Sequence, residues 1–383
     1  MASQLTRAWV EIDLGALLRN GARVAEFSSA RLLPMVKADA YGLGATRVAC
    51  ALQELDPWGF GVATVAEGDE LRRAGIEQPI LVFTPLLIEE FDAARRARLT
   101  PTLGSVDAIR EWGGAELPWH LAIDTGMNRA GVSWREVAKL HGAISASPPQ
   151  GVFTHFHSAD LGDGSREEQE RRFMKVLAEL PVRPQMIHAE NSPAVVRRGV
   201  NASGHWTLAR PGIFLYGVGS GDDAQIEPDA VVSVRARVVD MRSVEQGDTV
   251  SYGGTFRADS PRRIATLAIG YADGYRRALS NIGTVLVRGQ RAPVAGLVTM
   301  DMTMIDVTDL ACEIGDVATL IGGDGAEQLT VAGVAATAQL SPYELLTGLR
   351  SRLPRRYIHD DPRPTIHDPR STIHDPRSTI HER

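Results

Sequence analysis

The stretch RLLPMVKADAYGLG, residues 31–44, indicates the fold of this chain. It begins with a short apolar run, places a single lysine, Lys37, at the end of that run, and continues through a glycine-containing turn. A lysine beside a buried run is costly unless its charge is paired or its proton is released. Taken alone, Lys37 fits a structural ion pair. A functional role depends on what the rest of the chain places beside it.

The same unit recurs along the chain as far as about Gly217. The apolar runs are short, and several lack polar alternation, as expected of strands that are buried on both faces. Amphipathic segments separate them, such as residues 164–180, where Phe173 and Val176 share an apolar face. Eight such units predict an α/β protein whose residues 1–222 form a parallel (β/α)8 TIM-type barrel. The first dozen or so residues are expected to be free to pair with a second domain.

A second, mostly β domain is predicted over residues 223–357, where the sequence pattern changes. Apolar and polar residues alternate in VVSVRARVVDM, residues 231–241, as in a half-buried strand. TVLVRGQRAPVAG, residues 284–296, predicts a hairpin around Gly289 and Gln290. Residues 358–383 repeat a seven-residue unit that carries a proline, which predicts a disordered tail. Four of the ten histidines lie in this tail, but we predict no metal site there.

Composition narrows the class of protein. A chain of 383 residues with 44% hydrophobic and 23% charged residues is typical of a globular protein of about two domains. A net charge of −6 without a long basic run argues against nucleic acid as a partner. No stretch predicts a signal peptide or a membrane span. The two cysteines, Cys50 and Cys312, have no metal-like spacing, so we expect a cytoplasmic protein.

Cationic and hydrogen-bonding residues follow the predicted strands at the carboxyl end of the barrel, where TIM-type enzymes carry their active sites. They are Lys37, Arg129, His155, His188, Asn191, Ser192 and Arg210. No carboxylate pair accompanies them, which argues against glycoside hydrolysis. No P-loop or G-x-G-x-x-G follows a strand, so nucleotide binding has no support. Each residue also has an ordinary alternative: His155 or His157 as a core histidine, Arg210 as a salt-bridge partner, and Tyr271 as a packing aromatic.

A lysine in such a ring of cations is suited to attack an aldehyde. Burial and neighbouring positive charge lower its pKa below the reference value of about 10.4 and leave a neutral amine. Pyridoxal 5'-phosphate is the common aldehyde cofactor. TIM-type barrels often bind phosphate at the loops after the seventh and eighth strands, and those loops here read ENSPA (190–194) and RPGIF (210–214).

The chain resembles the alanine racemases, a fold-type III family of pyridoxal phosphate enzymes, over residues 5 to about 357. The matching stretches occur in the family's order and are therefore specific. They are VKADAYGLGA (36–45), HLAIDTGMNRAGV (120–132), THFHSAD (154–160), IHAENSPA (187–194), RPGIFLYG (210–217), SYGGTF (251–256), IGYADGY (269–275), VTMDMTMIDV (298–307) and SPYELL (341–346).

The resemblance implies a role for each matching residue. Lys37 would bond to pyridoxal phosphate and act as acid and base on one face of the substrate, and Tyr271 of a partner subunit would serve the other face. Arg129, with the backbone of Met300 from the partner subunit, would bind the substrate carboxylate. The remaining cofactor-binding residues would be His155 near the ring, Arg210 at the pyridine nitrogen, Tyr41, Ser192, Gly212, Ile213 and Tyr343 around the phosphate, and Asn191, with His188, as supports.

Two positions depart from the family pattern. Many members carry a lysine, often carbamylated, where this chain has Ala122, and a glycine where it has Asn128. Both lie close to Arg129, so another group must orient that arginine, such as a bound anion or the Asn128 side chain.

The expected function is a homodimeric racemase that interconverts L- and D-alanine and supplies D-alanine for peptidoglycan. Three alternatives stay open. The first is a racemase of broader specificity, for example for serine, because one methylene changes binding by only about 1–3 kcal/mol. The second is an amino-acid decarboxylase on the same architecture, and the third is a cofactor-binding protein without activity.

Overall fold

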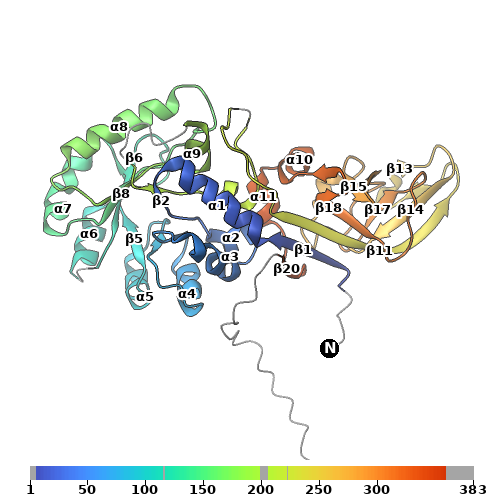
Figure 1. Cartoon of the computed structure of the whole chain (residues 1–383), viewed down its shortest axis with the longest axis horizontal. Coiled ribbons are helices and arrows are strands. Elements are labelled where there is room, and N and C mark those ends of the chain that lie inside the picture. The colour runs from blue at the N-terminus through green and yellow to red at the C-terminus, as the bar shows by residue number, and fades with distance from the viewer. Residues whose placement is uncertain (1–5, 115–116, 199–205, 222, 359–383) are drawn as a thin grey trace, which may run out of the picture.

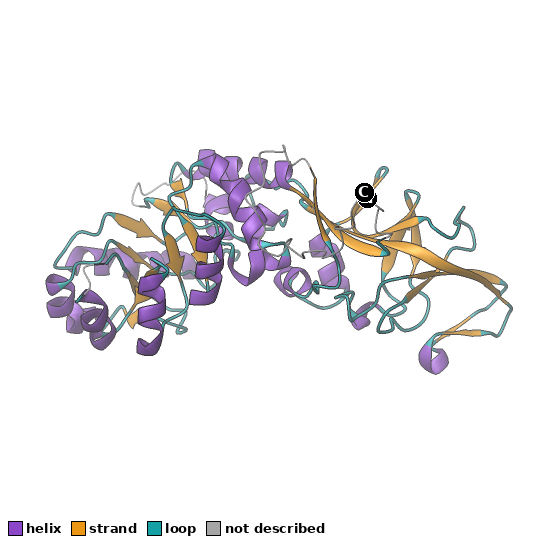
Figure 2. Cartoon of the chain, turned by 90° about the horizontal axis from the view of Figure 1, so that it is seen from below, coloured by secondary structure: helices purple, strands orange, loops and turns teal. Residues whose placement is uncertain are grey.

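The computed structural model describes residues 6–114, 117–198, 206–221 and 223–358 as two lobes. Figure 1 shows a lobe in which helices surround strands, joined to an elongated lobe made mainly of strands. Figure 2, from below, shows the same division between a helix-rich and a strand-rich part. The predicted tail lies outside the described residues apart from Ile358.

The first lobe is a ring of parallel strands, as predicted. Neighbouring strands pair in parallel from β3 to β9, and β10 pairs with β2. Two isolated bridges, Met35 with Gly61 and Asn191 with Arg210, join these two sheets and close the ring. The barrel strands are β2 (Arg31–Leu32), β3 (Phe60–Val62), β4 (Ile80–Val82), β5 (Thr100–Leu103), β6 (His120–Asp124), β8 (Gly151–Phe153), β9 (Met186–His188) and β10 (Leu208–Ala209), and the short β7 (Val132–Ser133) pairs with β6.

Helices cover the outside of this ring and bury one face each. In α8, the predicted apolar side chains Phe173 and Val176 are buried. In α4, Thr64 and Glu67 form a capping box that satisfies free backbone N–H groups at the start of the helix. The helices are α1 (Leu14–Ser28), α2 (Lys37–Gly42), α3 (Ala45–Leu52), α4 (Val65–Arg73), α5 (Phe91–Arg96), α6 (Val106–Gly113), α7 (His141–Ala146), α8 (Ser165–Glu179) and α9 (Ser192–Arg198).

The second lobe is built on a long strand, β11 (Val232–Val244), whose residues alternate between buried and partly exposed as the sequence predicts. The hairpin in 284–296 turns at Arg288 and Gly289, one residue earlier than predicted, because both adopt the positive φ that a tight hairpin turn requires. The other elements are β12 (Thr249–Val250), β13 (Phe256–Arg257), β14 (Arg262–Leu267), β15 (Thr284–Val287), β16 (Gln290–Pro293), β17 (Thr303–Asp306), β18 (Val317–Asp324), β19 (Glu327–Leu329), α10 (Val331–Thr337), α11 (Pro342–Thr347) and β20 (Arg355–Ile358).

The ends of the described chain meet in the second lobe. The first strand, β1 (Ala8–Asp13), pairs antiparallel with β11 and parallel with β20, so it belongs to the same sheet as both. Only after β1 does the chain enter the barrel through α1.

The two lobes are joined beside Lys37. The Arg355 Nη2 and Tyr357 Oη atoms donate hydrogen bonds to the carbonyls of Gly42 (2.8 Å) and Leu43 (2.9 Å). Helix α11 lies so close that a Cβ atom on Gly42 would come 2.7 Å from the Leu346 carbonyl oxygen. In the described ranges, no helix has the length and apolar character needed to span a membrane.

Candidate active site

Lys37 begins a turn of unusual handedness. The four residues that follow it, Ala38 to Tyr41, all have positive φ, between 51° and 59°. The left-handed conformation costs about 1–2 kcal/mol per residue for L-amino acids, so other contacts must hold it. Glu67 Oε1 accepts a hydrogen bond from Ala38 N (2.8 Å), and Asp39 Oδ1 accepts one from Ala45 N (2.7 Å). Backbone strain of this kind gathers at functional sites, and here it immediately follows Lys37 and sets the course of the chain to Tyr41.

The surroundings of Lys37 favour the neutral amine. Burial lowers its pKa most, the positive charge of Arg129 lowers it next, Glu67 opposes the shift, and Arg210 adds to it. No carboxylate in the described ranges lies within ion-pair distance of its Nζ atom. The structure therefore does not support the alternative of a structural ion pair, and it leaves an amine suited to nucleophilic attack.

Arg210 is buried and held in one orientation. Its Nη2 donates to the carbonyl oxygens of Thr154 (2.8 Å) and Ala189 (2.9 Å), and its Nη1 donates to His188 Nδ1 (2.8 Å). A guanidinium has five N–H groups, so two, on Nε and Nη1, have no acceptor in the described part of the chain. Burial lowers its pKa, and nearby Glu190 opposes that shift. These two N–H groups remain as donors for a group that accepts hydrogen bonds.

The two histidines of THFHS, His155 and His157, lie in different surroundings. His155 Nδ1 lies 3.4 Å from Arg210 Nη2, whereas His157 is exposed and its ring Nδ1 lies 2.7 Å from the Oγ of neighbouring Ser158. Burial, followed by the charges of Arg210, Arg129 and Lys37, lowers the pKa of His155 well below its usual value. His155 is therefore the site histidine, and it is a neutral ring.

A small polar cradle lies between α9 and the turn after β10. Ser192 Oγ accepts hydrogen bonds from Gly212 N (2.8 Å) and Phe214 N (3.4 Å), which leaves its own hydrogen free to donate. A Cβ atom on residue 212 would lie 2.3 Å from Tyr41 Oη, so only glycine leaves room there. The Tyr41 ring packs 4.6 Å from Tyr216 and 5.9 Å from Tyr343 (centroid distances), and Ile213 is buried beside the cradle. A compact anion such as a phosphate fits this combination of hydroxyls and close backbone.

Asn191 stabilises the loop that carries this cradle. Its Oδ1 accepts from Ala194 N (3.1 Å), and its Nδ2 donates to the Phe156 carbonyl (3.4 Å). Both contacts fix the loop between β9 and α9. Asn191 is thus placed as a support for the loop that carries Ser192.

Arg129 is exposed and lies on the loop after β6, in a turn that Asp124 organises. Asp124 Oδ1 accepts from Gly126 N (2.8 Å) and Asn128 N (3.1 Å), and Asn128 has φ of 53°. The Asn128 side chain donates to the Gly126 carbonyl (3.4 Å) and so stabilises the turn. The position where relatives carry a lysine, Ala122, is buried and brings no charge. Arg129 therefore acts on the site as a positive charge without a fixed partner in the described ranges.

Replacing Arg129 with glutamine is expected to raise the pKa of Lys37, because one of the charges that disfavour its ammonium form is lost. The chain has only three lysines, Lys37, Lys139 and Lys175. The rate at which an amine-selective reagent modifies the Lys37 peptide can therefore be followed by mass spectrometry against pH. Its midpoint should move to higher pH. The control, Arg135→Gln in the segment after β7, should leave it in place, and an unmoved midpoint in Arg129→Gln would contradict the electrostatic account.

Tyr271 and Met300 lie on the second lobe and are 42% and 53% exposed. Tyr271 N donates to the Thr299 carbonyl (3.0 Å), and Ala272 N donates to the Met300 carbonyl (3.0 Å), so hydrogen bonds join the two loops. The Met300 N–H remains available to bind a carboxylate. Among the residues that the structure describes, neither Tyr271 nor Met300 has an interaction with Lys37 of the same chain.

A second tyrosine on this surface, Tyr252, was missed by the sequence analysis. Its side chain is 74% exposed, and Ser251 before it has φ 67° and ψ −176°, a combination that side chains rarely adopt. Ser251 Oγ donates to the Leu297 carbonyl (2.7 Å), which ties Tyr252 to the segment that also holds Tyr271. Its sequence context, SYGGTF, has no periodic pattern that would have singled it out.

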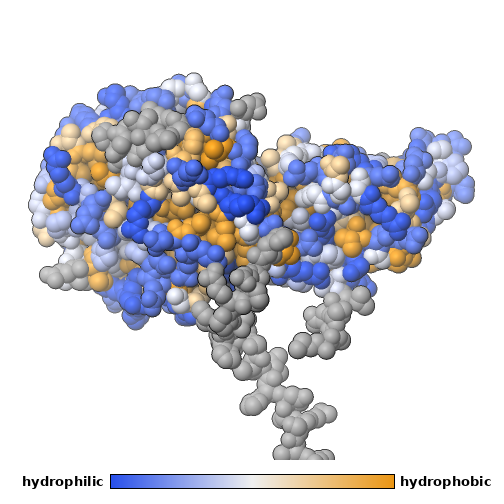
Figure 3. Space-filling view, in the orientation of Figure 1, coloured by the Kyte–Doolittle hydropathy of each residue, from blue (hydrophilic) through white to orange (hydrophobic). Residues whose placement is uncertain are grey.

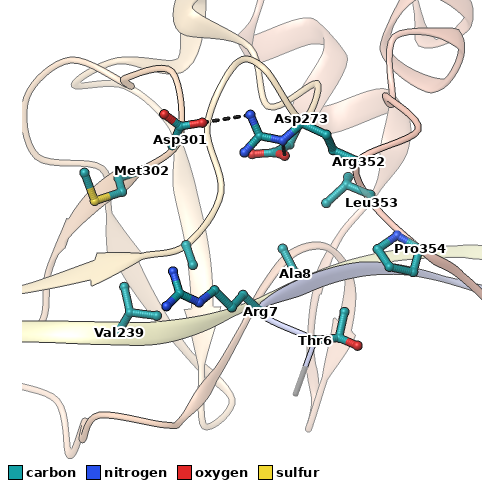
Figure 4. A pocket seen from close by; sticks show the side chains of 11 residues that line it. Thr6, Arg7, Ala8, Val239, Asp273, Asp301, Met302, Arg352, Leu353 and Pro354 are labelled. Carbon is teal, nitrogen blue, oxygen red and sulfur yellow. Dashed lines mark hydrogen bonds and ion pairs between the residues drawn. The ribbon is translucent and has the colours of Figure 1, made fainter. Parts of the chain in front are cut away.

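A cavity of about 630 Å3 lies behind these loops (Figure 4). Arg352 crosses one side of it and pairs with Asp273 (3.0 Å) and Asp301 (2.8 Å). Asp273 in turn accepts from Gly270 N (2.9 Å). The cavity is thus bordered by the ion pairs that hold the loops of Tyr271 and Met300 together.

Known proteins of one family are similar to this chain over most of its length. The sequence profile of the alanine racemase N-terminal domain matches residues 12–220, and that of the C-terminal domain matches residues 231–357. The chain belongs to the alanine racemase family. It is 37% identical to an alanine racemase of Nostoc sp., over 91% of this chain and 95% of that protein. It is 36% identical to one of Halothermothrix orenii, over 93% and 98%.

Solved structures of alanine racemases share the whole fold. The Bacillus anthracis enzyme, with bound L-Ala-P, has a TM-score of 0.85 at 32% identity and covers 94% of this chain and 97% of its own. The Bartonella henselae enzyme, with covalently bound pyridoxal phosphate, has a TM-score of 0.83 at 30% identity and covers 92% and 99%. The predicted fold, family and class of enzyme, an isomerase, are therefore confirmed.

Proposed function

We propose that this protein interconverts L- and D-alanine with pyridoxal phosphate bonded to Lys37. The observation that carries the proposal is the position of Lys37: a half-buried amine of lowered pKa in a site that also holds the polar cradle around Ser192. The covalently bound pyridoxal phosphate of the Bartonella henselae enzyme and the L-Ala-P of the Bacillus anthracis enzyme support the same cofactor and substrate.

The donors around the site suit pyridoxal phosphate. Ser192, Tyr41, Tyr343, Gly212 and the backbone at Ile213 would hold the phosphate, with Asn191 as their support. Arg210 would donate to the pyridine nitrogen through the N–H groups it has left, and His155 would lie beside the ring. When bound, the cofactor withdraws electrons from the substrate Cα and stabilises the charge that a lost proton leaves there.

Racemisation requires two proton carriers, one on each face of the substrate. Lys37 Nζ takes or returns the proton on one side, and burial and the charge of Arg129 assist it by lowering its pKa. A tyrosine of the second lobe does the same on the other side through its Oη atom. The sequence analysis names Tyr271 for this role. The strained backbone at Ser251 favours Tyr252 as a second candidate, since strain that serves to aim a side chain is typical of active sites.

The tyrosine is proposed to come from a second copy of the chain. The strand β13 that follows Tyr252 lies at the end of the second lobe farthest from α2 and Lys37 (Figure 1). The side chains of Tyr252, Tyr271, Ile282, Met300 and Met302 are all at least 42% exposed, although they are large and hydrophobic. The view in Figure 3 shows a surface of mixed character, with apolar patches between hydrophilic ones. An apolar surface beside two such tyrosines fits an interface in a homodimer with shared active sites.

Arg129 and the N–H of Met300 from the second copy would hold the substrate carboxylate. Ala122 provides no negative partner for the Arg129 side chain. We propose that the turn organised by Asp124 instead fixes the backbone position of Arg129. The two free cysteines, Cys50 and Cys312, support a cytoplasmic location. D-alanine made there would serve peptidoglycan synthesis.

Incubation with L-alanine in deuterium oxide tests the reaction. We expect deuterium at Cα and conversion to D-alanine without loss of CO2. Release of CO2 would instead indicate the decarboxylase, and cofactor binding without exchange at Cα would indicate a cofactor-binding protein without activity. A parallel incubation with L-serine measures the substrate range. Equal rates of racemisation for serine and alanine would show broad specificity.

A further inference from the structure

Two loops at the carboxyl end of the barrel carry groups that the proposed function needs together. Loop 125–131 follows β6 and carries Arg129, and loop 154–164 follows β8 and carries His155. Helix α8 begins directly after the second loop. One side chain of this helix, Gln169, is buried and contacts both loops.

The amide of Gln169 makes three hydrogen bonds. Its Oε1 accepts from His157 N (3.0 Å), and its Nε2 donates to the His155 carbonyl (3.1 Å) and to Thr125 Oγ1 (3.2 Å). A backbone N–H only donates and a carbonyl only accepts, so the orientation of the amide is determined. The reversed amide would place two donors together and two acceptors together, which is costly in a buried site. These contacts therefore require an amide.

Thr125 continues the connection toward Arg210. It directly follows β6 and is buried, and its Oγ1 lies 2.7 Å from Thr154 Oγ1 at the end of β8. The Thr154 carbonyl is one of the acceptors that hold Arg210 Nη2 (2.8 Å). The Thr125 hydroxyl thus joins Gln169 to the strand end that orients Arg210.

The same helix also holds the backbone of loop 125–131. Arg172 Nη1 donates to the Thr125 carbonyl (2.8 Å). A Cβ atom on Gly126 would come 3.2 Å from that Nη1 atom and 3.4 Å from the Cγ atom of Gln169. Helix α8 therefore packs directly against the start of the loop that carries Arg129.

We propose that Gln169 is a positioning residue that fixes the loop of Arg129 relative to the loop of His155. The proposed group for the substrate carboxylate and the ring beside the cofactor then keep a constant separation. A displacement of about 1 Å between reacting groups can lower a rate roughly 100-fold. The roles of these two residues rest on the proposed function, whereas the hydrogen bonds of Gln169 do not.

Hydrogen exchange of the wild-type holoenzyme tests those hydrogen bonds first. His157 is exposed, and no backbone carbonyl in the described part of the chain accepts its N–H. Its protection therefore depends on Gln169 Oε1. Mass spectrometry with residue-level fragmentation should show that this amide exchanges more slowly than the same amide in the unfolded chain. Exchange at the unfolded rate would overturn the proposal, and this measurement requires no variant to fold.

Three kinds of substitution then separate positioning from stability. Gln169→Met fills similar space without the amide, so it should speed exchange at His157 and lower kcat/KM for alanine roughly 10-fold to 100-fold. Thr125→Val removes the hydroxyl and should lower kcat/KM likewise, whereas Thr125→Ser keeps the hydroxyl and should keep the wild-type value. Val176→Ala removes buried apolar atoms from the same helix. It should lower the unfolding temperature but leave kcat/KM and the exchange of His157 unchanged.

The outcomes distinguish this proposal from the proposed function. Wild-type kcat/KM in Gln169→Met, or equal values in Thr125→Val and Thr125→Ser, would overturn the positioning role. A loss of kcat/KM in Val176→Ala as large as that in Gln169→Met would also overturn it, because stability alone would then explain both. Slow exchange at His157 in a wild-type protein without racemase activity would instead refute the proposed function alone. If Gln169→Met does not fold, the two Thr125 variants and the wild-type exchange still decide.

Discussion

Replacing Lys37 with alanine is expected to lower racemase activity by roughly 10⁴-fold or more, because the variant loses both the covalent attachment and one proton carrier. The loss should be specific to this amine. Borohydride should fix pyridoxal phosphate to the wild-type protein on the peptide that contains Lys37, and it should fix none to the variant.

The chain provides its own controls for this experiment. Lys139 and Lys175 are exposed on the outer surface of the barrel lobe and pair with Glu136 and Glu179. Lys139→Ala and Lys175→Ala should keep full activity and full labelling at Lys37. Labelling of either of these lysines in the wild type, or an active Lys37→Ala protein, would refute the assignment of the amine.

Replacement of the second proton carrier with phenylalanine is expected to reduce racemisation by roughly 10²–10⁴-fold, the usual contribution of a general acid or base. Exchange at Cα should nevertheless survive for one enantiomer. Lys37 can still remove a proton from its own face and return a deuteron to that face, so configuration is retained. Tyr252→Phe and Tyr271→Phe are matched changes on one surface, and the variant that exchanges without inverting identifies the carrier.

Mixing of variants tests whether the carrier comes from the second chain. Equal amounts of Lys37→Ala and the inactive tyrosine variant, dissociated and reassembled, should restore about a quarter of the sites, because half of the random dimers contain one complete site. No recovery would indicate that each chain completes its own site. If both tyrosine variants racemise at the wild-type rate, the two-carrier mechanism proposed here is wrong.

Local patterns in the sequence are sufficient to predict the barrel and its catalytic end. Short apolar runs at regular intervals mark strands buried on both faces, and residues at their ends must gather at one edge. For this reason Lys37, His155, Ser192 and Arg210 are found together as expected. The alternation of β11 is equally local, and the structure reproduces it.

Features that depend on contacts between residues far apart in the sequence could not be predicted from local patterns. The left-handed turn after Lys37 uses alanines and a tyrosine, which have no preference for positive φ, and it is held by Glu67 from another element. His120 and His188 are 68 positions apart in the sequence, and their ring nitrogens lie 2.8 Å apart only because β6, β8 and β9 are consecutive strands of the barrel. Tyr252 has no periodic pattern around it, and its importance becomes apparent only from exposure and backbone strain.

The place of the first strand affects how this protein is synthesised. Residues 8–13 leave the ribosome well before their partners, which are residues 232–244 and 355–358. Strand β1 therefore has no strand partner until those residues have been made. Contacts between residues so far apart in the sequence form slowly. Removing the first dozen residues should thus damage the sheet that carries both candidate tyrosines, although those residues are attached directly to the barrel.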